Sequence, residues 1–234
     1  MKFAISAKSR VQPIPGATGI CQCCGSALIA KCGTQKVWHW AHESKQFCDK
    51  WWEPETNWHR DWKNLFPEEL QEVIQTAPDG EKHIADVKLP SGTVIEFQHS
   101  SISDSERRSR EEFYKDMFWI VDGRRNKNDL KRFEKGFSPP WPYWRARTEK
   151  LIHWIDCEWY FPKMWLNSKV KVLFDFGFIQ RPGDYEHGKQ KPQWKSDLIC
   201  LFPRSQENHG QYQAEFRRIL PIKRSDILKT DKAW

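Results

Sequence analysis

HIADVKLPSGTVIEFQHSSIS, residues 83–103, is the stretch that decides the predicted fold. Residues 83–89 alternate between apolar and polar side chains, as a half-buried strand does, and residues 93–98 alternate again. Residues 90–92 (Pro-Ser-Gly) between them are turn formers. Because the connection is so short, the two strands are predicted to form an antiparallel hairpin.

Three polar side chains carry the chemistry of this hairpin. Glu96 and Gln98 lie two residues apart, so they share one side of their strand, and Asp86 can lie beside them on the neighbouring strand. Two carboxylates held together repel each other unless a cation lies between them, and hard divalent ions prefer oxygen ligands. The pattern therefore favours a Mg²⁺ or Mn²⁺ site at Asp86 and Glu96. The alternative is an ordinary surface hairpin with two solvated acids.

A helix is predicted upstream, in EPETNWHRDWKNLFPEELQEVIQ, residues 53–75. Glu55, His59 and Lys63 recur every four residues and would share one face of this helix. By itself such a row can be a solvated ladder of ion pairs. If it lies near the hairpin, Lys63 supplies positive charge and His59 handles protons near neutral pH.

Downstream, residues 104–114 (DSERRSREEFY) are predicted to form a helix capped by Ser103 or Asp104. Residues 117–121 (MFWIV) are continuously apolar, which is typical of a buried central strand. The predicted order is then helix, strand, strand, helix, strand.

An Asp, a turn and Glu-x-Gln in this setting resemble the PD-(D/E)xK nuclease superfamily, with Gln98 where the motif usually has lysine. The resemblance implies an α/β, restriction-endonuclease-like fold with an αβββαβ core and a mixed sheet, in which one strand remains unassigned. It also implies metal-dependent phosphodiester cleavage, with Glu55 as a possible further Mg²⁺ ligand beside Asp86 and Glu96. Glutamine offers only a dipole where lysine offers a charge, so Lys63 could replace the missing cation.

Over roughly residues 20–135 the chain is similar to the CoiA-like competence family, in which the Glu-x-Gln form is usual. The matching positions are Glu55, His59, Lys63, Asp86, Glu96, Gln98, Ser100 or Ser101, Ser103 and Tyr114. Members of that family carry a PD-(D/E)xK nuclease domain and are associated with DNA uptake and recombination. The resemblance therefore implies the same setting for this chain.

The N-terminal region is rich in zinc-ligand residues. Five of the seven cysteines lie between residues 21 and 48, and Cys21 and Cys24 have the C-x2-C spacing of a zinc knuckle. A predicted hairpin in residues 27–40 then leads to two histidines and a cysteine. We expect a closed structural Zn²⁺ site, because a module of about 50 residues has little core of its own. The preferred ligands are Cys21, Cys24, His42 and Cys48, with His39 as an alternative to Cys48. Buried reduced thiols without metal are the competing interpretation.

Composition points to a polyanionic partner. The 234 residues carry a formal net charge of +7, a pI of about 9.0 and a mean hydropathy of −0.80. A basic balance favours nucleic acid, here DNA, although solvated lysines and arginines alone give the same balance. No apolar run reaches the length of a signal peptide core or a membrane span, so a cytoplasmic protein is expected.

Two segments are predicted to contact nucleic acid. The first is the helix at 104–114, and the second is the aromatic and basic run WPYWRAR at 141–147. The residues are Arg107, Arg108, Arg110, Trp144, Arg145 and Arg147. For most of the 14 tryptophans, packing in the core is the preferred interpretation.

Changes in composition along the chain and a proline-rich segment predict three domains. Residues 1–50 would be the zinc module, residues 51–137 the nuclease core, and residues 143–234 a C-terminal α+β extension that could add strands to the nuclease sheet. SPPWP, residues 138–142, would be the linker. Within the extension, strands are expected at 169–178 and 197–202 and a helix at 213–220.

The function favoured by the sequence is a divalent-metal-dependent nuclease in recombination, competence or mobile-element defence. Asp86 and Glu96 would hold the metal, Gln98 would orient water, and Lys63 would stabilise the transition state. His59 would position the phosphate or relay a proton. The alternative is a zinc-containing DNA-binding protein whose degenerate nuclease fold does not cut.

Overall fold

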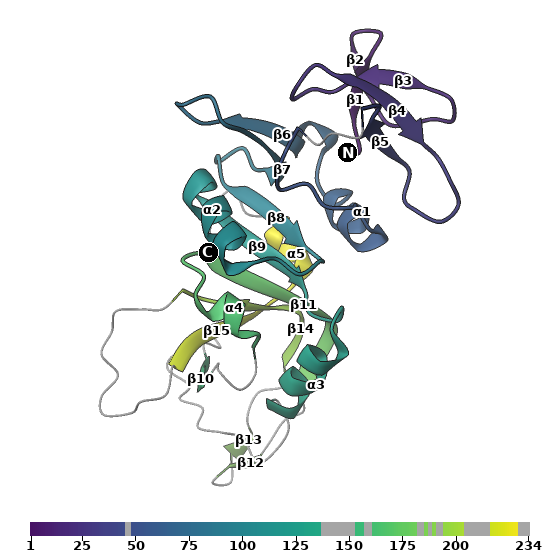
Figure 1. Ribbon diagram of the computed structural model, residues 1–234. Helices are drawn as coiled ribbons and strands as arrows, with labels where there is room; N and C mark the ends of the chain where they lie inside the picture. Colours follow the sequence, from purple (N-terminus) through teal and green to yellow (C-terminus); the bar gives the residue numbers. More distant parts are fainter. Residues whose placement is uncertain are drawn as a thin grey trace. The chain divides into compact units, whose positions relative to one another are not determined.

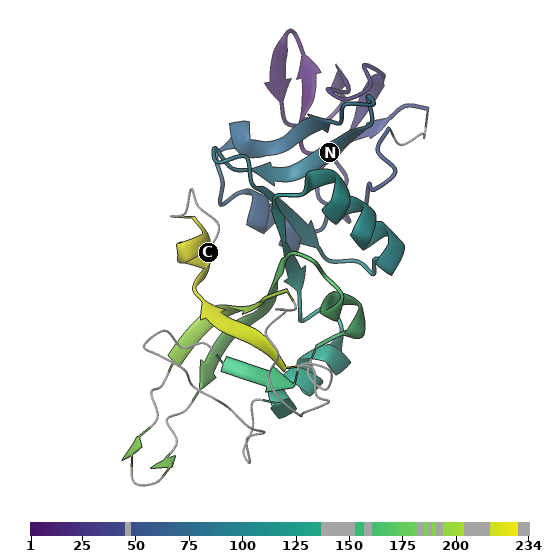
Figure 2. The same ribbon diagram turned by 90° about the vertical axis from the view of Figure 1, so that its left-hand side faces the viewer.

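A computed structural model describes residues 1–44, 48–136, 153–156, 161–181, 185–186, 189–190, 194–203 and 216–228. The chain forms two compact units, residues 1–100 and residues 101–234 (Figures 1 and 2). Both units contain helices and strands, so the α/β class is confirmed at this level. Because the division falls at residue 100, the predicted boundaries near residues 50 and 137 stay predictions.

The first unit begins with a five-stranded antiparallel sheet, drawn purple to blue in Figure 1. Its strands, in the order β2-β1-β3-β4-β5, are β1 (Ala4–Ser6), β2 (Ser9–Val11), β3 (Thr18–Ile20), β4 (Ala27–Lys31) and β5 (His39–His42). The antiparallel pairing of β4 with β5 confirms the hairpin predicted in residues 27–40. Its hydrophobic core, among the described residues, is a small cluster of four buried side chains, with partly buried hydrophobic residues packed against it; the four are Ala4, Cys21, Leu28 and Trp40. Gly19 is needed here, since a Cβ atom on it would lie 2.9 Å from the Cβ atom of Ala4.

The upstream helix is shorter than predicted. Helix α1 (Asn57–Lys63) is capped by Thr56, whose hydroxyl accepts from the His59 backbone N–H at 3.3 Å. Pro67 lies beyond its end and cannot continue a helix. A 3₁₀ turn, η1 (Glu68–Leu70), and a strand, β6 (Gln71–Thr76), follow. The predicted helix is confirmed only over residues 57–63, and β6 is the strand that the sequence left unassigned.

Strands β7 (Lys82–Lys88) and β8 (Val94–Gln98) form the predicted antiparallel hairpin. Gly92, with φ +96°, makes its turn, and the Leu89 N–H donates to the Thr93 carbonyl at 2.9 Å. Strand β6 pairs antiparallel with β7 on the other side. Every residue of β8 is buried, which explains its largely apolar sequence.

The second unit contains a mixed sheet. Its strands are hydrogen-bonded in the order β10-β15-β14-β11-β9, and only the β9–β11 pair is parallel. They are β9 (Met117–Asp122), β10 (His153–Asp156), β11 (Lys171–Arg181), β14 (Trp194–Leu201) and β15 (Phe216–Ile222). The remaining elements are α2 (Asp104–Tyr114), α3 (Lys127–Gly136), α4 (Lys163–Leu166), α5 (Arg224–Ile227) and the short strands β12 (Tyr185–Glu186) and β13 (Lys189–Gln190).

Several predictions for this unit can be compared with these elements. The helix at 104–114 is confirmed, with the Ser103 hydroxyl accepting from the Glu106 N–H at 3.1 Å. The helix predicted at 213–220 is wrong where it is described, because residues 216–222 form β15. The linker predicted at 138–142 lies outside the described residues. Along the chain, α1, β6, β7, β8, α2 and β9 follow the αβββαβ order.

Candidate functional site

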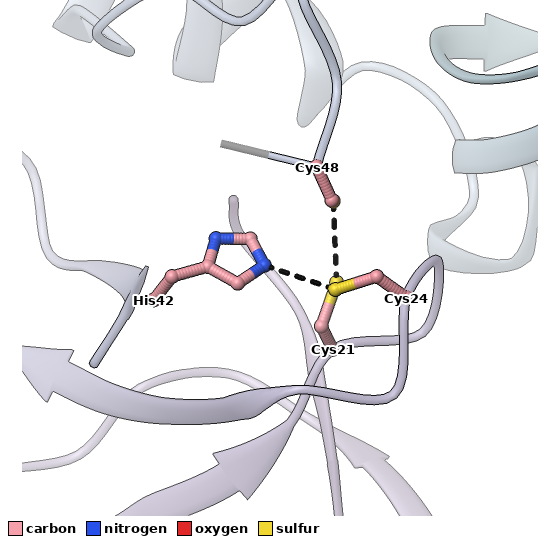
Figure 3. A group of neighbouring side chains, drawn as sticks. All are labelled: Cys21, Cys24, His42 and Cys48. Atoms are coloured by element: carbon pink, nitrogen blue, oxygen red, sulfur yellow. Dashed lines mark hydrogen bonds between the residues drawn. The ribbon is translucent and has the colours of Figure 1, made fainter. Parts of the chain in front are cut away.

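Four metal-ligand side chains meet beside the N-terminal sheet. The ligand atoms of Cys21, Cys24, His42 and Cys48 all lie within 4.8 Å of one another (Figure 3). The Sγ atoms of Cys21 and Cys48 are 3.7 Å apart, and the Cys24 Sγ is 3.3 Å from the His42 Nε2. These are the four preferred ligands of the sequence analysis.

The spacing of these atoms fits a tetrahedral ion. With zinc–sulfur bonds of about 2.3 Å, two sulfur ligands of a tetrahedron lie about 3.8 Å apart. Thiolate and imidazole are also the donors that Zn²⁺ prefers, so this Cys₃His group can bind a metal such as zinc. His39 lies outside the group, with its Nδ1 2.8 Å from the Val37 carbonyl oxygen. Residues 39 and 42 are three apart on β5 and so face opposite sides of the strand.

The pKa values of the Cys24 and Cys48 thiols are shifted in opposite directions. Burial raises the pKa of Cys24, but hydrogen bonds from Ser26 and His42 outweigh it and lower that pKa to about 6. Burial and the neighbouring Cys21 raise the pKa of Cys48. A bound cation would favour the thiolate form at every position, because metal ligation requires deprotonated sulfur.

A second cluster surrounds the ammonium group of Lys63, which is buried at the end of α1. Its Nζ lies 2.7 Å from Glu55 Oε1, 2.9 Å from Glu72 Oε1 and 3.7 Å from Asp86 Oδ1. Burial lowers the pKa of Lys63, but Glu72, Glu55 and Asp86 together raise it above its ordinary value. Lys63 is therefore a fixed positive charge and not a solvated member of a surface ladder.

Glu55 lies before α1 and not on the predicted helix face. Arg60 donates to both of its carboxylate oxygens, at 3.0 and 2.7 Å. Burial raises the pKa of Glu55, but Lys63 and Arg60 outweigh it and lower that pKa to about 2. Because Lys63 and Arg60 already engage both oxygens, the structure places Glu55 in an ion-pair network.

Glu72 is a buried residue of this cluster that the sequence analysis missed. Its carboxylate accepts from the backbone N–H groups of Lys2 at 2.7 Å and Phe3 at 3.1 Å, so it ties the N-terminal sheet to Lys63. Its backbone has φ +47°, a conformation uncommon for residues with side chains. No short-range pattern reveals it, since the backbone N–H groups of Lys2 and Phe3 lie about seventy residues earlier in the chain.

Asp86 and Glu96 lie side by side in the hairpin, as predicted. The Asp86 N–H donates to Glu96 Oε1 at 3.2 Å, and the Phe97 N–H donates to Asp86 Oδ2 at 3.0 Å. Glu96 is buried, whereas the Asp86 side chain is 23% exposed. Burial raises the pKa of Asp86 against the lowering effects of Lys63 and His59. A cation beside Asp86 would reverse that rise.

Gln98 is buried and lies beside Glu53, a second residue that the sequence analysis missed. Its amide nitrogen donates to Glu53 Oε2 at 3.2 Å and to the Ser100 carbonyl at 3.0 Å. Its Oε1 atom is buried and has no hydrogen-bond partner among the described residues. An unpaired buried oxygen is costly and fits a missing donor or cation.

His59 is held from both sides of its ring. Its Nε2 lies 2.9 Å from Glu53 Oε1 and 2.8 Å from the Phe97 carbonyl oxygen, and its Nδ1 lies 3.1 Å from the Thr56 hydroxyl. Because Nε2 faces two acceptors, it carries a hydrogen. Burial lowers the pKa of His59, but Glu53 and Asp86 outweigh it and raise that pKa.

The hairpin carboxylates do not form a cluster as tight as the Cys₃His group. Among the described residues, that group is the one set of three or more candidate ligands close enough to hold a metal. Mg²⁺ needs fewer protein ligands than such a site provides, because it keeps several waters and binds through one or two carboxylates together with substrate phosphates. Asp86 and Glu96 are two neighbouring carboxylates of this kind, whereas both oxygens of Glu55 are engaged by Lys63 and Arg60.

The arginines predicted to contact DNA are placed differently from one another. Arg107 is fully buried and bonded to Asp104 and Glu111, and Arg110 is buried against Glu106. These two are therefore packing residues of α2, and the surface role predicted for them is wrong. Arg108 is 55% exposed and pairs with Asp104 at 2.8 Å. Trp144, Arg145 and Arg147 lie outside the described residues.

No helix in the described part of the chain is long and apolar enough to cross a membrane. No curated protein and no solved structure matches the chain. A family model does match, over residues 17–50, and its description is "Competence protein CoiA, N-terminal domain". The matched segment contains all four residues of the Cys₃His group. The likeness predicted from the sequence is thus confirmed over residues 17–50, where the chain is similar to the N-terminal domain of the CoiA family.

Proposed function

We propose that the chain is a divalent-metal-dependent nuclease that cleaves DNA in a competence-related process. The observation that carries the proposal is the hairpin, where Asp86 and Glu96 are hydrogen-bonded neighbours and Gln98 follows on the same strand. The αβββαβ order of elements supports the predicted PD-(D/E)xK fold. The match to the competence family supports the biological setting.

The chain's own residues suit phosphodiester hydrolysis. Asp86 and Glu96 would hold Mg²⁺ or Mn²⁺, which when bound polarises a phosphate and lowers the pKa of its water. Lys63 supplies a permanent positive charge 3.7 Å from Asp86, in place of the lysine absent at position 98. Gln98 has an unpaired Oε1 that can accept a hydrogen bond from water. His59 holds the Phe97 carbonyl and Glu53, so it acts as a positioning residue.

The Cys₃His group is assigned a different task. All four ligand positions come from the protein, which is the arrangement of a closed structural Zn²⁺ site. We propose that it organises the N-terminal sheet, whose core of four buried residues is too small to be stable alone. Exposed basic groups such as Arg108 would add salt-sensitive contacts to the DNA backbone.

A second candidate function is DNA binding without cleavage. Lys63 favours it, because its ammonium is closer to Glu55 and Glu72 than to Asp86 and could serve stability alone. In this case the hairpin is a structural remnant. The two functions predict the same affinity for DNA and opposite effects of Mg²⁺ or Mn²⁺ on its integrity.

Cleavage of plasmid and oligonucleotide DNA with Mg²⁺ or Mn²⁺ separates the two functions. We expect Asp86→Asn and Glu96→Gln to abolish cleavage while DNA binding is retained, and Asp61→Asn, an exposed acid of α1, to cut like the wild type. If wild-type protein leaves single-stranded, duplex and branched DNA intact yet binds it in a salt-sensitive way, the non-cleaving function is correct.

A further inference from the structure

Asp49 is a buried carboxylate that neither the Cys₃His group nor the hairpin site uses directly. It follows Cys48 and is 7% exposed. Its Oδ1 accepts from the His83 ring at 2.8 Å and from the Trp51 N–H at 2.9 Å, and its Oδ2 accepts from the Ile84 N–H at 2.8 Å. His83 and Ile84 belong to β7, three and two residues before Asp86. Asp49 therefore fastens a metal-ligand position to the strand of the hairpin site.

Two further contacts strengthen this attachment. The indole ring of Trp51 stacks on the imidazole of His83, with ring centroids 3.3 Å apart and planes 13° apart. Both residues are buried. The segment after Cys48 is thus fixed to β7 by a charge-assisted hydrogen-bond cluster and by an aromatic stack.

Glu53 lies at the other end of the same segment. One carboxylate oxygen lies 2.9 Å from His59 Nε2, and the other accepts from the Gln98 amide at 3.2 Å and from the Ser100 hydroxyl. Glu53 therefore sets the orientation of two residues of the proposed hydrolytic site. Its signal in the sequence was weak, because it belongs to no periodic pattern.

We propose that residues 48–53, which we call the strap, couple occupancy of the Cys₃His group by a zinc-type ion to the order of the hairpin site. With the ion bound, Cys48 holds the strap in place, so Asp49 clamps β7 and Glu53 orients His59 and Gln98. Without the ion the strap loses its anchor, and the hairpin loses order. Asp49 and Glu53 are positioning residues in this scheme, and only its consequence for DNA cleavage rests on the proposed function.

The proposed coupling between the Cys₃His group and the hairpin site follows from the small core of the N-terminal sheet. The N-terminal sheet has four buried core residues, so removal of an ion bound by four protein ligands should unfold its ligand loops. Cys48 would then be free to move, and any motion would pull on Asp49, whose three donors all lie within 2.9 Å. The alternative is that the Asp49 cluster holds β7 in place without the metal. In that case the structural effect of metal loss would not extend beyond Cys48.

Hydrogen exchange of the full chain, with zinc and after treatment with a chelator, decides between these outcomes. We expect chelation to reduce protection at least tenfold both in residues 18–42 and at the amides of Ile84, Asp86 and Phe97. Residues 171–176 of β11 in the second unit serve as the internal control and should keep their protection. Loss confined to residues 18–42 would overturn the proposal. Neither outcome depends on whether the protein cuts DNA.

Asp49→Asn tests the strap with all metal ligands intact. The variant keeps the size of the side chain but loses its charge, so we expect normal zinc content together with weakened protection at Ile84. Chelation should then have little additional effect on the hairpin, because the connection is already broken. Asp61→Asn is the matched control. Wild-type protection at Ile84 in the Asp49→Asn variant would contradict the role of Asp49, and if this variant does not fold, the exchange experiment on wild-type protein still decides.

Discussion

Two polar clusters within residues 1–100, the Cys₃His group and the cluster around Lys63, balance their charge in opposite ways. In the Cys₃His group four donor atoms lie within 4.8 Å of one another, and the group itself contains no lysine or arginine. Around Lys63, by contrast, carboxylates from Glu55, Glu72 and Asp86 surround a single ammonium. The first cluster can bind a cation from solution, whereas the protein supplies the cation of the second.

This difference explains why proximity of acidic or sulfur ligands alone does not identify a metal site. Burying an anion without a partner is costly, and either a metal or a basic side chain removes the cost. Lys63 has taken that role for Glu55 and Glu72. In the proposed function Mg²⁺ would therefore bind beside Asp86 and Glu96, away from Lys63. Each prediction below tests one of the two clusters.

Removal of a metal ligand should have the largest effect. We expect Cys21→Ser to abolish zinc binding and to unfold the N-terminal sheet, since structural zinc contributes on the order of 10 kcal/mol. Cys32→Ser is the control, because Cys32 is a free cysteine outside the group. Metal content by elemental analysis and thermal melting provide the measurements. A Cys21→Ser protein with one zinc per chain and a wild-type melting temperature would contradict the view that the Cys₃His group is stabilised by a bound metal.

Removal of the internal cation should have the next largest effect. In Lys63→Met, Glu55 and Glu72 stay buried without their common partner, so unfolding should be easier by about 3–5 kcal/mol. Urea denaturation measures this change, and Lys82→Met, at an exposed position of β7, should match the wild type. A loss below about 1 kcal/mol would mean that the carboxylates find other partners. Adding Glu55→Gln to Lys63→Met should restore part of the loss.

The pH dependence of stability should reveal Glu55. Its folded pKa of about 2 lies below the ordinary 4.5, so its stabilisation is complete above pH 4.5 and is lost as pH falls toward 2. The difference corresponds to about 3 kcal/mol. Glu55→Gln removes this titration, so its stability should fall less steeply than that of the wild type between pH 4.5 and 2. Equal slopes in urea titrations across this range would show that Glu55 is not held by Lys63 and Arg60.

A feature of the fold or of the site could be predicted from the sequence where the residues that form it lie close together in the chain. The hairpin followed from two alternating runs around Pro-Ser-Gly, and the Cys₃His group followed from ligand types and short spacings. Glu72 could not be found this way, because Lys2 and Phe3 are distant in sequence. The strand β6 was not assigned, because the sequence analysis of residues 53–75 rested on the helical spacing of Glu55, His59 and Lys63.

The arginines of α2 show a signal that was present but misinterpreted. Arg107 has an acid three residues before it and another four residues after it, and Arg110 has an acid four residues before it. Those spacings are the ones at which side chains meet on a helix. The acids therefore indicated internal ion pairs, and only Arg108 was left as a surface charge. Counting basic residues without their helical neighbours overestimated the predicted DNA surface.

The smallest expected effect comes from an ion pair that resembles Lys63–Glu55 in chemistry but not in burial. Lys50 lies on the strap and pairs with Glu81 at 2.5 Å, yet the two side chains are 63% and 41% exposed. Water and salt screen such a pair, so Lys50→Met should leave the urea midpoint unchanged within error. High salt should likewise affect wild-type and Lys50→Met proteins equally. A clear loss of stability in this variant would mean that the strap depends on Lys50 as well as Asp49. Burial alone would then not explain why the Lys63 ion pairs contribute more to stability than the Lys50–Glu81 pair.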